Sequence, residues 1–252
     1  MKGASIGAHW GLARSLATYY GNPFRARARR IFYGNFIRPR DLCFDIGAHV
    51  GDRIRTWSQL GAQIVAVEPQ PLCMEVLRSF YGRRANVVLI EQAVGAEIGR
   101  RTLHLSEHTP TVSTLSAPWL EKVSRTKGFN HVHWDKSISV SVTTLDALIE
   151  THGRPVFCKI DVEGYEEEVL RGLSHALPSL SFEYIPAVVE IAVSCIDRLT
   201  ALGDYEFNFA RGEDFRFVLD AWVDAGDAQR LLAGERPDGR SGDIYARLKG
   251  GG

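Results

Sequence analysis

The chain of 252 residues lacks the features of secreted, disulfide-rich and membrane-spanning proteins. Its cysteines are few and widely spaced, at Cys43, Cys73, Cys158 and Cys195. This spacing matches neither a disulfide framework nor a zinc site, so we expect reduced core thiols. Nowhere do eighteen uninterrupted apolar residues occur, and residues 1–20 contain no signal-type apolar core. We therefore expect a soluble, cytoplasmic protein without a transmembrane segment.

An excess of charge of one sign is also absent, because 30 basic residues balance 30 acidic ones. No global field then recruits nucleic acid or an acidic membrane, and we expect no nucleic-acid partner. One local exception is the basic run at residues 25–30, which has aromatic residues around it. Such a run can bind RNA or a membrane surface. We favour a helical cap or lid over residues 1–40, with its arginines facing solvent.

From Asp41 onward, strand and helix patterns alternate, which is typical of a mostly parallel sheet covered on both faces. Because 45% of the residues are hydrophobic, residues 41–252 can form one large α/β domain. Seven strands are predicted, at residues 42–46, 63–67, 86–90, 155–160, 180–184, 205–210 and 242–247. Helices are predicted at residues 52–60, 71–81, 144–151, 165–173 and 190–202.

Residues 102–141 interrupt this alternation with serine, threonine, proline, histidine and glycine. Ligands of open α/β sheets bind beyond the carboxyl ends of the strands, and the insertion begins at that edge. We therefore expect it to form the wall that faces the substrate. Its pair Ser113 and Thr114 is a candidate for contacts with substrate hydroxyls, or the end of a loop.

A glycine turn follows the first predicted strand, in the sequence Asp45-Ile46-Gly47-Ala48-His49-Val50-Gly51, and the second strand ends at Glu68. Glycines let a backbone approach a ligand closely, and a carboxylate at that strand tip can accept hydrogen bonds from two ribose hydroxyls. A tight turn in a sheet that binds no ligand is the alternative interpretation.

The spacing of the turn disfavours a dinucleotide. Counted from Gly47, the third position, which should be glycine for contact with a pyrophosphate, is His49. The sixth is Asp52, whose carboxylate would repel phosphate from the helix end. A cofactor with ribose and adenine but no phosphate fits better, and S-adenosylmethionine is the common example. Asp45 would then lie close to its ammonium group.

A second group of carboxylates follows two later strands. Asp161 and Glu163 come after the strand that ends at Ile160, and Glu183 lies near the end of the next one. Methyl transfer to an alcohol needs a proton acceptor beside a nucleophile held in line. Asp161 and Glu183 are our candidates for base or acceptor orientation, and Glu163 for a supporting carboxylate. Together they could hold magnesium, but we do not expect a metal.

These residues resemble the FkbM family of S-adenosylmethionine-dependent methyltransferases. The segment Lys159-Ile160-Asp161-Val162-Glu163-Gly164-Tyr165-Glu166 is similar to the family signature, and the resemblance runs from about Phe36 to Phe209. Further matches fall in the family's order: the glycine turn, Glu68-Pro69, Ala93-Val94-Gly95, Thr144-Leu145-Asp146 and Phe182-Glu183-Tyr184.

The resemblance implies a class I methyltransferase fold, Rossmann-like and doubly wound, with seven strands of which the last is antiparallel. It implies O-methylation of a hydroxylated small molecule, sugar or glycolipid. The residues implied for the cofactor are Asp45, Gly47, Ala48, His49 and Gly51 at its methionine part, Glu68 with Pro69 at the ribose, and Gln92 with Ala93 at the adenine. His49 departs from the family pattern, since many members have Asn there.

Two other functions remain open. A nucleotide-dependent oxidoreductase uses a related glycine turn, although His49 and Asp52 argue against it. A methyltransferase-like module without catalysis could bind partners through the basic run at residues 25–30. The acceptor and the oligomeric state do not follow from the sequence.

Overall fold

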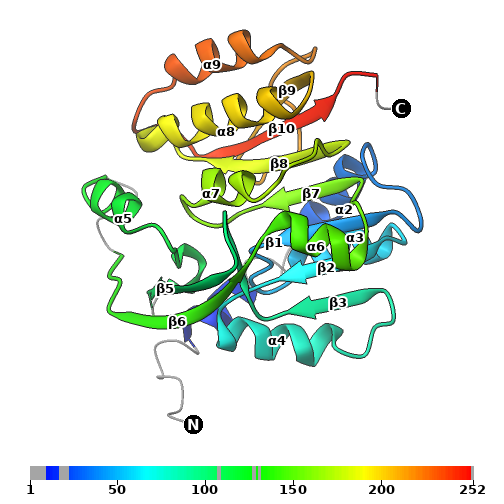
Figure 1. Cartoon of the computed structure of the whole chain (residues 1–252), viewed down its shortest axis with the longest axis vertical. Coiled ribbons are helices and arrows are strands. Elements are labelled where there is room, and N and C mark those ends of the chain that lie inside the picture. Colours follow the sequence, from blue (N-terminus) through cyan, green and yellow to red (C-terminus); the bar gives the residue numbers. More distant parts are fainter. Residues whose placement is uncertain (1–9, 17–22, 107–108, 127–128, 130–131, 251–252) are drawn as a thin grey trace.

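The computed structural model describes residues 10–16, 23–106, 109–126, 129 and 132–250. Its main sheet has seven strands in the order β3-β2-β1-β7-β8-β10-β9 (Figure 1). Their bounds are β1 Leu42–Ile46, β2 Gln63–Val67, β3 Val87–Ile90, β7 Phe157–Ile160, β8 Ser179–Tyr184, β9 Tyr205–Arg211 and β10 Gly242–Leu248. Strand β10 pairs antiparallel with both β8 and β9, and the other pairs in this sheet are parallel. All seven sequence predictions are confirmed to within two residues.

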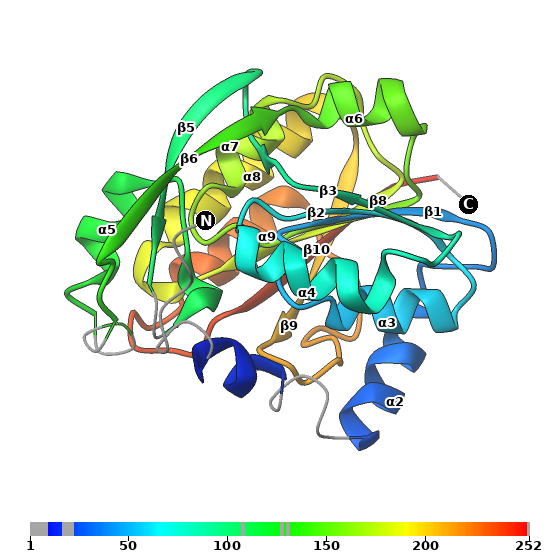
Figure 2. The ribbon, with the colours of Figure 1, turned by 90° about the horizontal axis from the view of Figure 1, so that it is seen from below.

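Helices cover both faces of this sheet (Figure 2). One face carries α2 Pro23–Tyr33, α3 Asp52–Gln59 and α4 Pro71–Tyr81, and the other carries α6 Leu145–His152, α7 Glu166–Arg171, α8 Val189–Leu202 and α9 Ala225–Ala233. The apolar residues of each strand alternate between two cores: Phe44 packs with α6 to α8, and Cys43 packs with α2 to α4. This is the doubly wound, mostly parallel α/β arrangement that the sequence predicts. Helix α9 was not predicted.

The segment after β3 folds into a second sheet that the sequence did not predict. Its order is β4-β6-β5, with bounds β4 Ala93–Val94, β5 Gly99–Leu105 and β6 Lys136–Thr143. Short helices η1 Pro110–Val112 and α5 Ala117–Val123 lie in the connection, and η2 Pro186–Val188 follows β8. Figure 1 shows β5, β6 and α5 beyond the carboxyl ends of the parallel strands. The sheet therefore spans more of the chain than the predicted insertion at residues 102–141.

The N-terminal helix α2 belongs to the packed core. Phe32 and Tyr33 are buried, and Phe32 contacts the rings of Phe217 and Tyr245. The prediction that the arginines face solvent holds for most of the helix but is wrong for Arg29. That side chain is buried, because it forms an ion pair with Asp52 of α3. A lid function for residues 1–40, and the division from residues 41–252, stay predictions.

The sequence predicts that the protein has neither disulfide bonds nor a transmembrane segment. All four cysteines are free and buried, as we expected for core thiols. In the described part of the chain, none of the helices combines the length and the apolar character that crossing a bilayer requires.

The turn between β1 and α3 depends on glycine because of contacts within the protein. Gly47 has a φ of 83°, and a Cβ atom there would lie 1.9 Å from the carbonyl oxygen of Asp161. Gly51 has a φ of 82°, and its Cβ would lie 2.6 Å from the ring of Tyr81. These glycines therefore let the turn pack against the loop after β7 and against α4. That they also allow the close approach of a ligand stays a prediction.

We expect Gly47→Ala to lower the free energy of unfolding by about 3 kcal/mol or more, since it combines backbone strain with overpacking against a carbonyl group. Urea unfolding followed by circular dichroism measures this. The control is Gly99→Ala, where a Cβ would meet nothing within 4 Å. Equal stability of the two variants would show that β1 and β7 do not approach each other this closely.

Candidate active site

A cavity of about 780 Å³, including space open to solvent, lies beyond the carboxyl ends of β1, β2 and β7. The walls come from the turn after β1, the tips of β2 and β3, the loop after β7 and the second sheet. The lining residues are Ile46, Gly47, His49, Asp52, Arg53, Val67, Glu68, Pro69, Gln70, Gln92, Ala93, Val94, Leu103, Thr111, Ser113, Thr114, Leu115, Asp161, Val162, Glu163 and Tyr165.

Most of the residues predicted for the site line this cavity. They are Gly47, His49, Glu68, Pro69, Gln92 and Ala93 of the proposed cofactor set, and Asp161 and Glu163 of the proposed catalytic set. Four do not line it: Asp45, Ala48, Gly51 and Glu183. Ser113 and Thr114 of the segment 102–141 do, together with Thr111 and Leu115. That segment therefore does contribute a wall.

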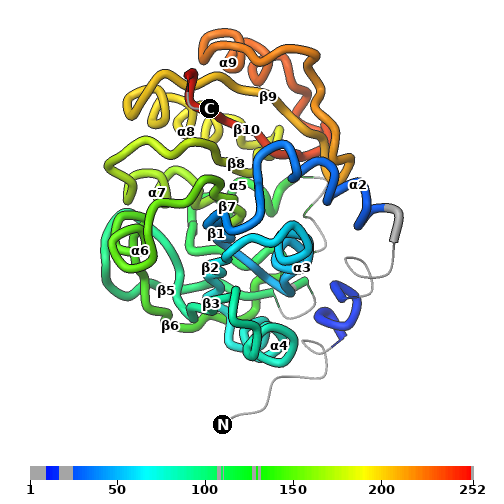
Figure 3. The backbone as a smooth tube through the Cα atoms, turned by 90° about the vertical axis from the view of Figure 1, so that its right-hand side faces the viewer, coloured from blue at the N-terminus to red at the C-terminus, as the bar shows by residue number. Residues whose placement is uncertain are grey.

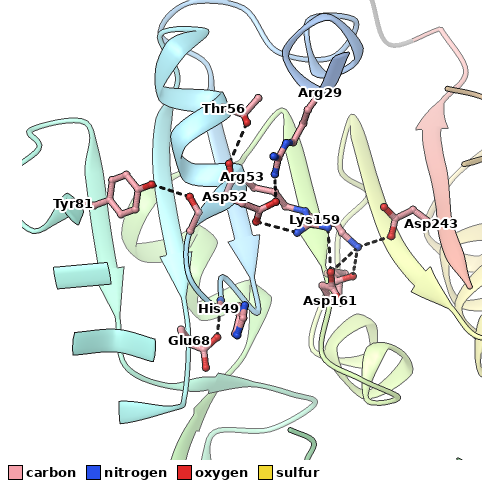
Figure 4. A network of polar contacts seen from close by, with 12 residues as sticks. Arg29, His49, Asp52, Arg53, Thr56, Glu68, Tyr81, Lys159, Asp161 and Asp243 are labelled. Atoms are coloured by element: carbon pink, nitrogen blue, oxygen red, sulfur yellow. Dashed lines mark hydrogen bonds and ion pairs between the residues drawn. The ribbon is translucent and has the colours of Figure 1, made fainter. Parts of the chain in front are cut away.

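Glu68 directly follows β2, and its carboxylate binds the backbone of two nearby segments. Its Oε2 accepts a hydrogen bond from the backbone N–H of His49 at 2.8 Å, and its Oε1 accepts one from Gln70 at 2.9 Å. Figure 4 shows Glu68 and His49 side by side at the wall. Burial raises the pKa of Glu68 to about 7, although both backbone hydrogen bonds act to lower it. Each carboxylate oxygen keeps a second lone pair with which to accept from a ligand hydroxyl.

His49 is a non-glycine residue in the left-handed region, with a φ of 46°. Its imidazole lines the cavity at the place where a dinucleotide site requires glycine. Burial lowers the pKa of His49 to about 4, so the ring is neutral at pH 7. The side chain therefore occupies space at the turn without adding positive charge.

A buried lysine organises the other side of the cavity (Figure 4). Lys159 of β7 is fully buried, and its Nζ lies 2.7 Å from Asp243 Oδ1 on β10 and 3.4 Å from Asp161 Oδ2. Arg53 of α3 lies 3.3 Å from the same Asp161 oxygen. Burial alone would raise the pKa of Asp161, but Lys159 and Arg53 outweigh it, and the pKa is lowered. Asp161 is therefore a stable anion and a weak proton acceptor.

Asp52 does not present an uncompensated charge at the start of α3. It forms ion pairs with Arg29 of α2 and, at 3.3 Å, with Arg53. The prediction that this carboxylate repels phosphate from the helix end is wrong, because two guanidinium groups balance the charge of Asp52.

Three carboxylates meet after β7 and β8. One oxygen each of Asp161, Glu163 and Glu183 lies within 4.8 Å of the others. Burial, and then the neighbouring carboxylates, raise the pKa values of Glu163 and Glu183 well above their ordinary range. Asp161 is already ionised, so these two glutamates hold protons to a higher pH than usual.

The loop that carries Glu163 is fixed by Glu166. Glu166 is buried, and its Oε1 accepts hydrogen bonds from the backbone N–H groups of Val162 at 3.1 Å and Gly164 at 3.2 Å. A carboxylate in the first turn of a helix is favoured by the helix dipole, and Glu166 in addition holds the backbone of this loop in place. Trp119 of α5 packs directly over Gly164. Glu163 itself has a φ of 55°, so the loop is held in a conformation that side chains rarely adopt.

The family model for the "Methyltransferase FkbM domain" matches residues 45–213, which is more than half of the chain. The chain belongs to the FkbM methyltransferase family. The matched range includes the glycine turn, Glu68 and the loop after β7, and it agrees with the resemblance found in the sequence. The match therefore covers every predicted site residue of this FkbM protein.

A curated relative is the hexuronic acid methyltransferase AglP of Haloferax volcanii. The two are 29% identical over 153 residues, which cover 60% of this chain and 56% of AglP. This FkbM chain thus matches little more than half the length of that relative.

Solved structures of methyltransferases are also similar. The precorrin-6y C5,15-methyltransferase of Geobacter metallireducens has a TM-score of 0.46 at 13% identity, covering 88% of this chain and 87% of the other. The fibrillarin of Aeropyrum pernix, solved with S-adenosyl-L-methionine, has a TM-score of 0.42 at 14% identity, covering 83% and 67%. We draw no functional conclusion from likenesses at this level.

Several residues of the FkbM site were missed in the sequence. Lys159, Arg53 and Asp243 form the network around Asp161, and Arg29 balances Asp52. Lys159 offered a signal, because a lysine inside a run of buried strand residues needs an anionic partner. Asp243 and Arg29 offered none, since both are far away in the sequence.

Asp45 lies behind the cavity wall. Its side chain is 1% exposed, and among the described residues neither carboxylate oxygen has a hydrogen-bond partner. Burial raises the pKa of Asp45 to about 6, against the opposing effect of Arg53. Contact between this carboxylate and an ammonium group of the cofactor stays a prediction.

The buried carboxyl group of Asp45 makes a prediction for stability. Its folded pKa exceeds the value of about 3.9 in unfolded chains, so its stabilising contribution is lost as the pH rises from about 4 to 6. Asp45→Asn removes this dependence. The free energy of unfolding of the variant relative to the wild type should rise by about 2–3 kcal/mol between pH 4 and pH 7. Urea titrations at several pH values measure it, and a difference that does not vary with pH contradicts the burial of an unpaired carboxylate.

Proposed function

We propose that this protein transfers the methyl group of S-adenosylmethionine to a hydroxyl oxygen of a carbohydrate-like acceptor. The observation that carries the proposal is the composition of the cavity wall, where the described lining residues combine four acidic side chains, those of Asp52, Glu68, Asp161 and Glu163, with the single cationic side chain of Arg53. Such a wall disfavours a diphosphate and favours a cationic ligand. When bound, the sulfonium group supplies an electrophilic methyl that an oxygen nucleophile can displace.

The residues on the wall fit this cofactor. Glu68 would accept the ribose hydroxyls, because it stands at the tip of β2 with lone pairs to spare. Gln92 and Ala93 would flank the adenine, and Gly47 and His49 the methionine part. The imidazole of His49 adds a further obstacle to a pyrophosphate at the turn. Asp45 lies one layer deeper, so it would act on the ammonium group only through space.

Glu163 is the residue that we propose as the proton acceptor. Asp161 is held as an anion by Lys159 and Arg53, so its affinity for a proton is low. Glu183 contributes to the carboxylate cluster but does not line the cavity. Glu163 lines the cavity and has a raised pKa, which makes it the stronger base once ionised. Asp161 would then orient the acceptor hydroxyl.

The acceptor class follows from the second sheet and from the family. In the connection between β5 and β6 of that sheet, Thr111, Ser113 and Thr114 place short polar side chains on the cavity wall. Hydroxyl groups of this kind exchange hydrogen bonds with sugar hydroxyls in both directions. AglP, which its name describes as a hexuronic acid methyltransferase, supports a carbohydrate acceptor. The family resemblance adds glycolipids and other hydroxylated small molecules as acceptors.

Glu68→Gln should weaken the binding of S-adenosylmethionine by about 1–3 kcal/mol, since it removes a charged hydrogen-bond acceptor from the ribose. Calorimetric titration measures this, and Glu97→Gln at an exposed position is the matched control. An unchanged dissociation constant would show that Glu68 does not contact the ribose. Titration with NAD in parallel tests the oxidoreductase alternative, and binding of neither compound favours the interaction module.

Glu163→Gln should lower turnover by about 10²–10⁴-fold, the usual contribution of a general base, with little change in cofactor affinity. In the wild type, the rate should rise with pH, because the raised pKa of Glu163 keeps the base protonated at lower pH. The control is Glu167→Gln on α7, outside the cavity wall. A carbohydrate-acceptor screen with tritiated methyl donor gives the rate, and full activity of Glu163→Gln would exclude it as the base. Assays with and without a chelator test the magnesium alternative.

A further inference from the structure

The chain has no net charge, but its basic and acidic residues are unevenly distributed along the sequence. Residues 1–40 contain eight basic residues and no acidic one, so the remaining residues hold 22 basic and 30 acidic side chains. An asymmetry of this kind is typical of a segment that contacts a polyanionic surface. Among these basic side chains, that of Arg29 is buried in the described fold, where it forms an ion pair with Asp52.

The outer face of α2 combines positive charge with an exposed apolar side chain. Arg27 and Ile31 are one helical turn apart, and Arg30 lies beside them. All three are exposed, and Ile31 has 64% of its surface accessible. The inner face of the same helix buries Phe32 and Tyr33. The arrangement therefore presents Arg27, Arg30 and Ile31 to the surroundings on a helix anchored in the core.

The helical segment at residues 10–16 repeats this arrangement. Trp10 and Arg14 are also four residues apart and exposed, and Trp10 is 74% accessible. Leu12 on the inner face packs against Val50 and Cys73. A solvated tryptophan of this size is costly unless something covers it.

Both helices lie on the same side of the main sheet. Residues 10–16 pack on the start of α3 and on α4, and α2 packs on α3. Figures 2 and 3 show both helices on this side. An apolar hollow beside residues 10–16 and α4 is lined by Leu16, Phe80 and Tyr81, together with Arg55 of α3 and Arg84. Phe80 is half exposed.

We propose that this surface docks on a bilayer that contains anionic phospholipids. We name it the basic face and define it by Trp10, Arg14, Arg27, Arg30, Ile31, Phe80 and Arg84. The arginines would lie at the level of the lipid phosphates, while Trp10, Ile31 and Phe80 enter the boundary between headgroups and acyl chains. The charge of the basic face complements such a surface, and its exposed apolar residues match the interior just below it.

The apolar residues favour a lipid surface over RNA. Phosphate groups of RNA would be neutralised by arginine alone, and bases would stack on planar aromatic rings. Ile31 is aliphatic and lies next to Arg30 and one helical turn after Arg27, so it cannot stack on a base as an aromatic ring does. Inserted into a bilayer, it removes apolar surface from water.

The basic face is linked to the cavity through one ion pair. Arg29 of α2 binds Asp52, which lines the cavity. Docking would thus position the cavity close to the headgroup layer, where a lipid-linked acceptor would be presented. The inference about docking does not depend on the proposed reaction, and its test requires no methyl transfer.

The experiment measures co-sedimentation of the full chain with vesicles of phosphatidylcholine alone and with phosphatidylglycerol added. We expect binding to the anionic vesicles and its loss as the salt concentration rises. Arg27→Glu with Arg30→Glu should weaken binding by about 30-fold or more, because each arginine near an anionic surface contributes about 1 kcal/mol. Trp10→Ser with Ile31→Ser should weaken it by about tenfold or more.

Matched controls carry the same changes elsewhere on the surface. They are Arg101→Glu with Arg125→Glu, and Ile98→Ser with Leu231→Ser, all at exposed positions. Circular dichroism confirms that each variant is folded. Absence of vesicle binding, equal losses in the controls, or no effect of either basic-face variant would overturn the proposal. Binding of a single-stranded RNA in place of the vesicles would assign the basic face to nucleic acid.

Discussion

The arrangement of the site depends on the burial of the positive charge of Lys159. A lysine without any exposed surface is tolerated only when anions surround it, and Asp161 and Asp243 provide them at 3.4 and 2.7 Å. Asp243 belongs to the antiparallel strand β10, so this contact ties the reversed end of the sheet to the parallel strands. The positive charge of Lys159 also holds Asp161 as an anion at the cavity wall. A structural requirement of the sheet thereby decides which carboxylate is free to accept a proton.

The other half of the site follows from how closely β1 and β7 approach each other. The missing side chain of Gly47 allows the carbonyl group of Asp161 to lie against the turn. The glycine turn and the acidic loop therefore share one edge, although more than a hundred residues separate them in the sequence. Glu68 fixes the far side of the turn by accepting the N–H of His49. The cavity thus lies between the ends of β2 and β7, which are followed by Glu68 and Asp161. The packing of the main chain sets the distance between these two strand ends.

The sequence predicts what local pattern determines. Uninterrupted apolar runs identify the seven strands, and strand ends identify Glu68, Asp161 and Glu163 as wall residues, because ligands bind at that edge. The second sheet was missed although Lys136–Thr143 alternates polar with apolar residues as a half-buried strand does, because the surrounding segment is rich in loop-forming residue types. Arg29 was assigned to solvent because its partner Asp52 belongs to another helix. The packing of Gly47 against Asp161 was also missed, since a sequence does not show which backbone lies opposite a turn.

The charges of the site explain how a carboxylate can serve as base in a crowded acidic pocket. If Asp161, Glu163 and Glu183 carried separate negative charges, their mutual repulsion would disfavour the fold. Lys159 and Arg53 neutralise Asp161, and the raised pKa values of the two glutamates allow them to share protons. A cationic cofactor bound beside Glu163 would lower its pKa again, since an opposite charge nearby favours the ionised form. Binding of the methyl donor would therefore itself generate the base, and the proton of the acceptor hydroxyl would be taken up only when both reactants are present.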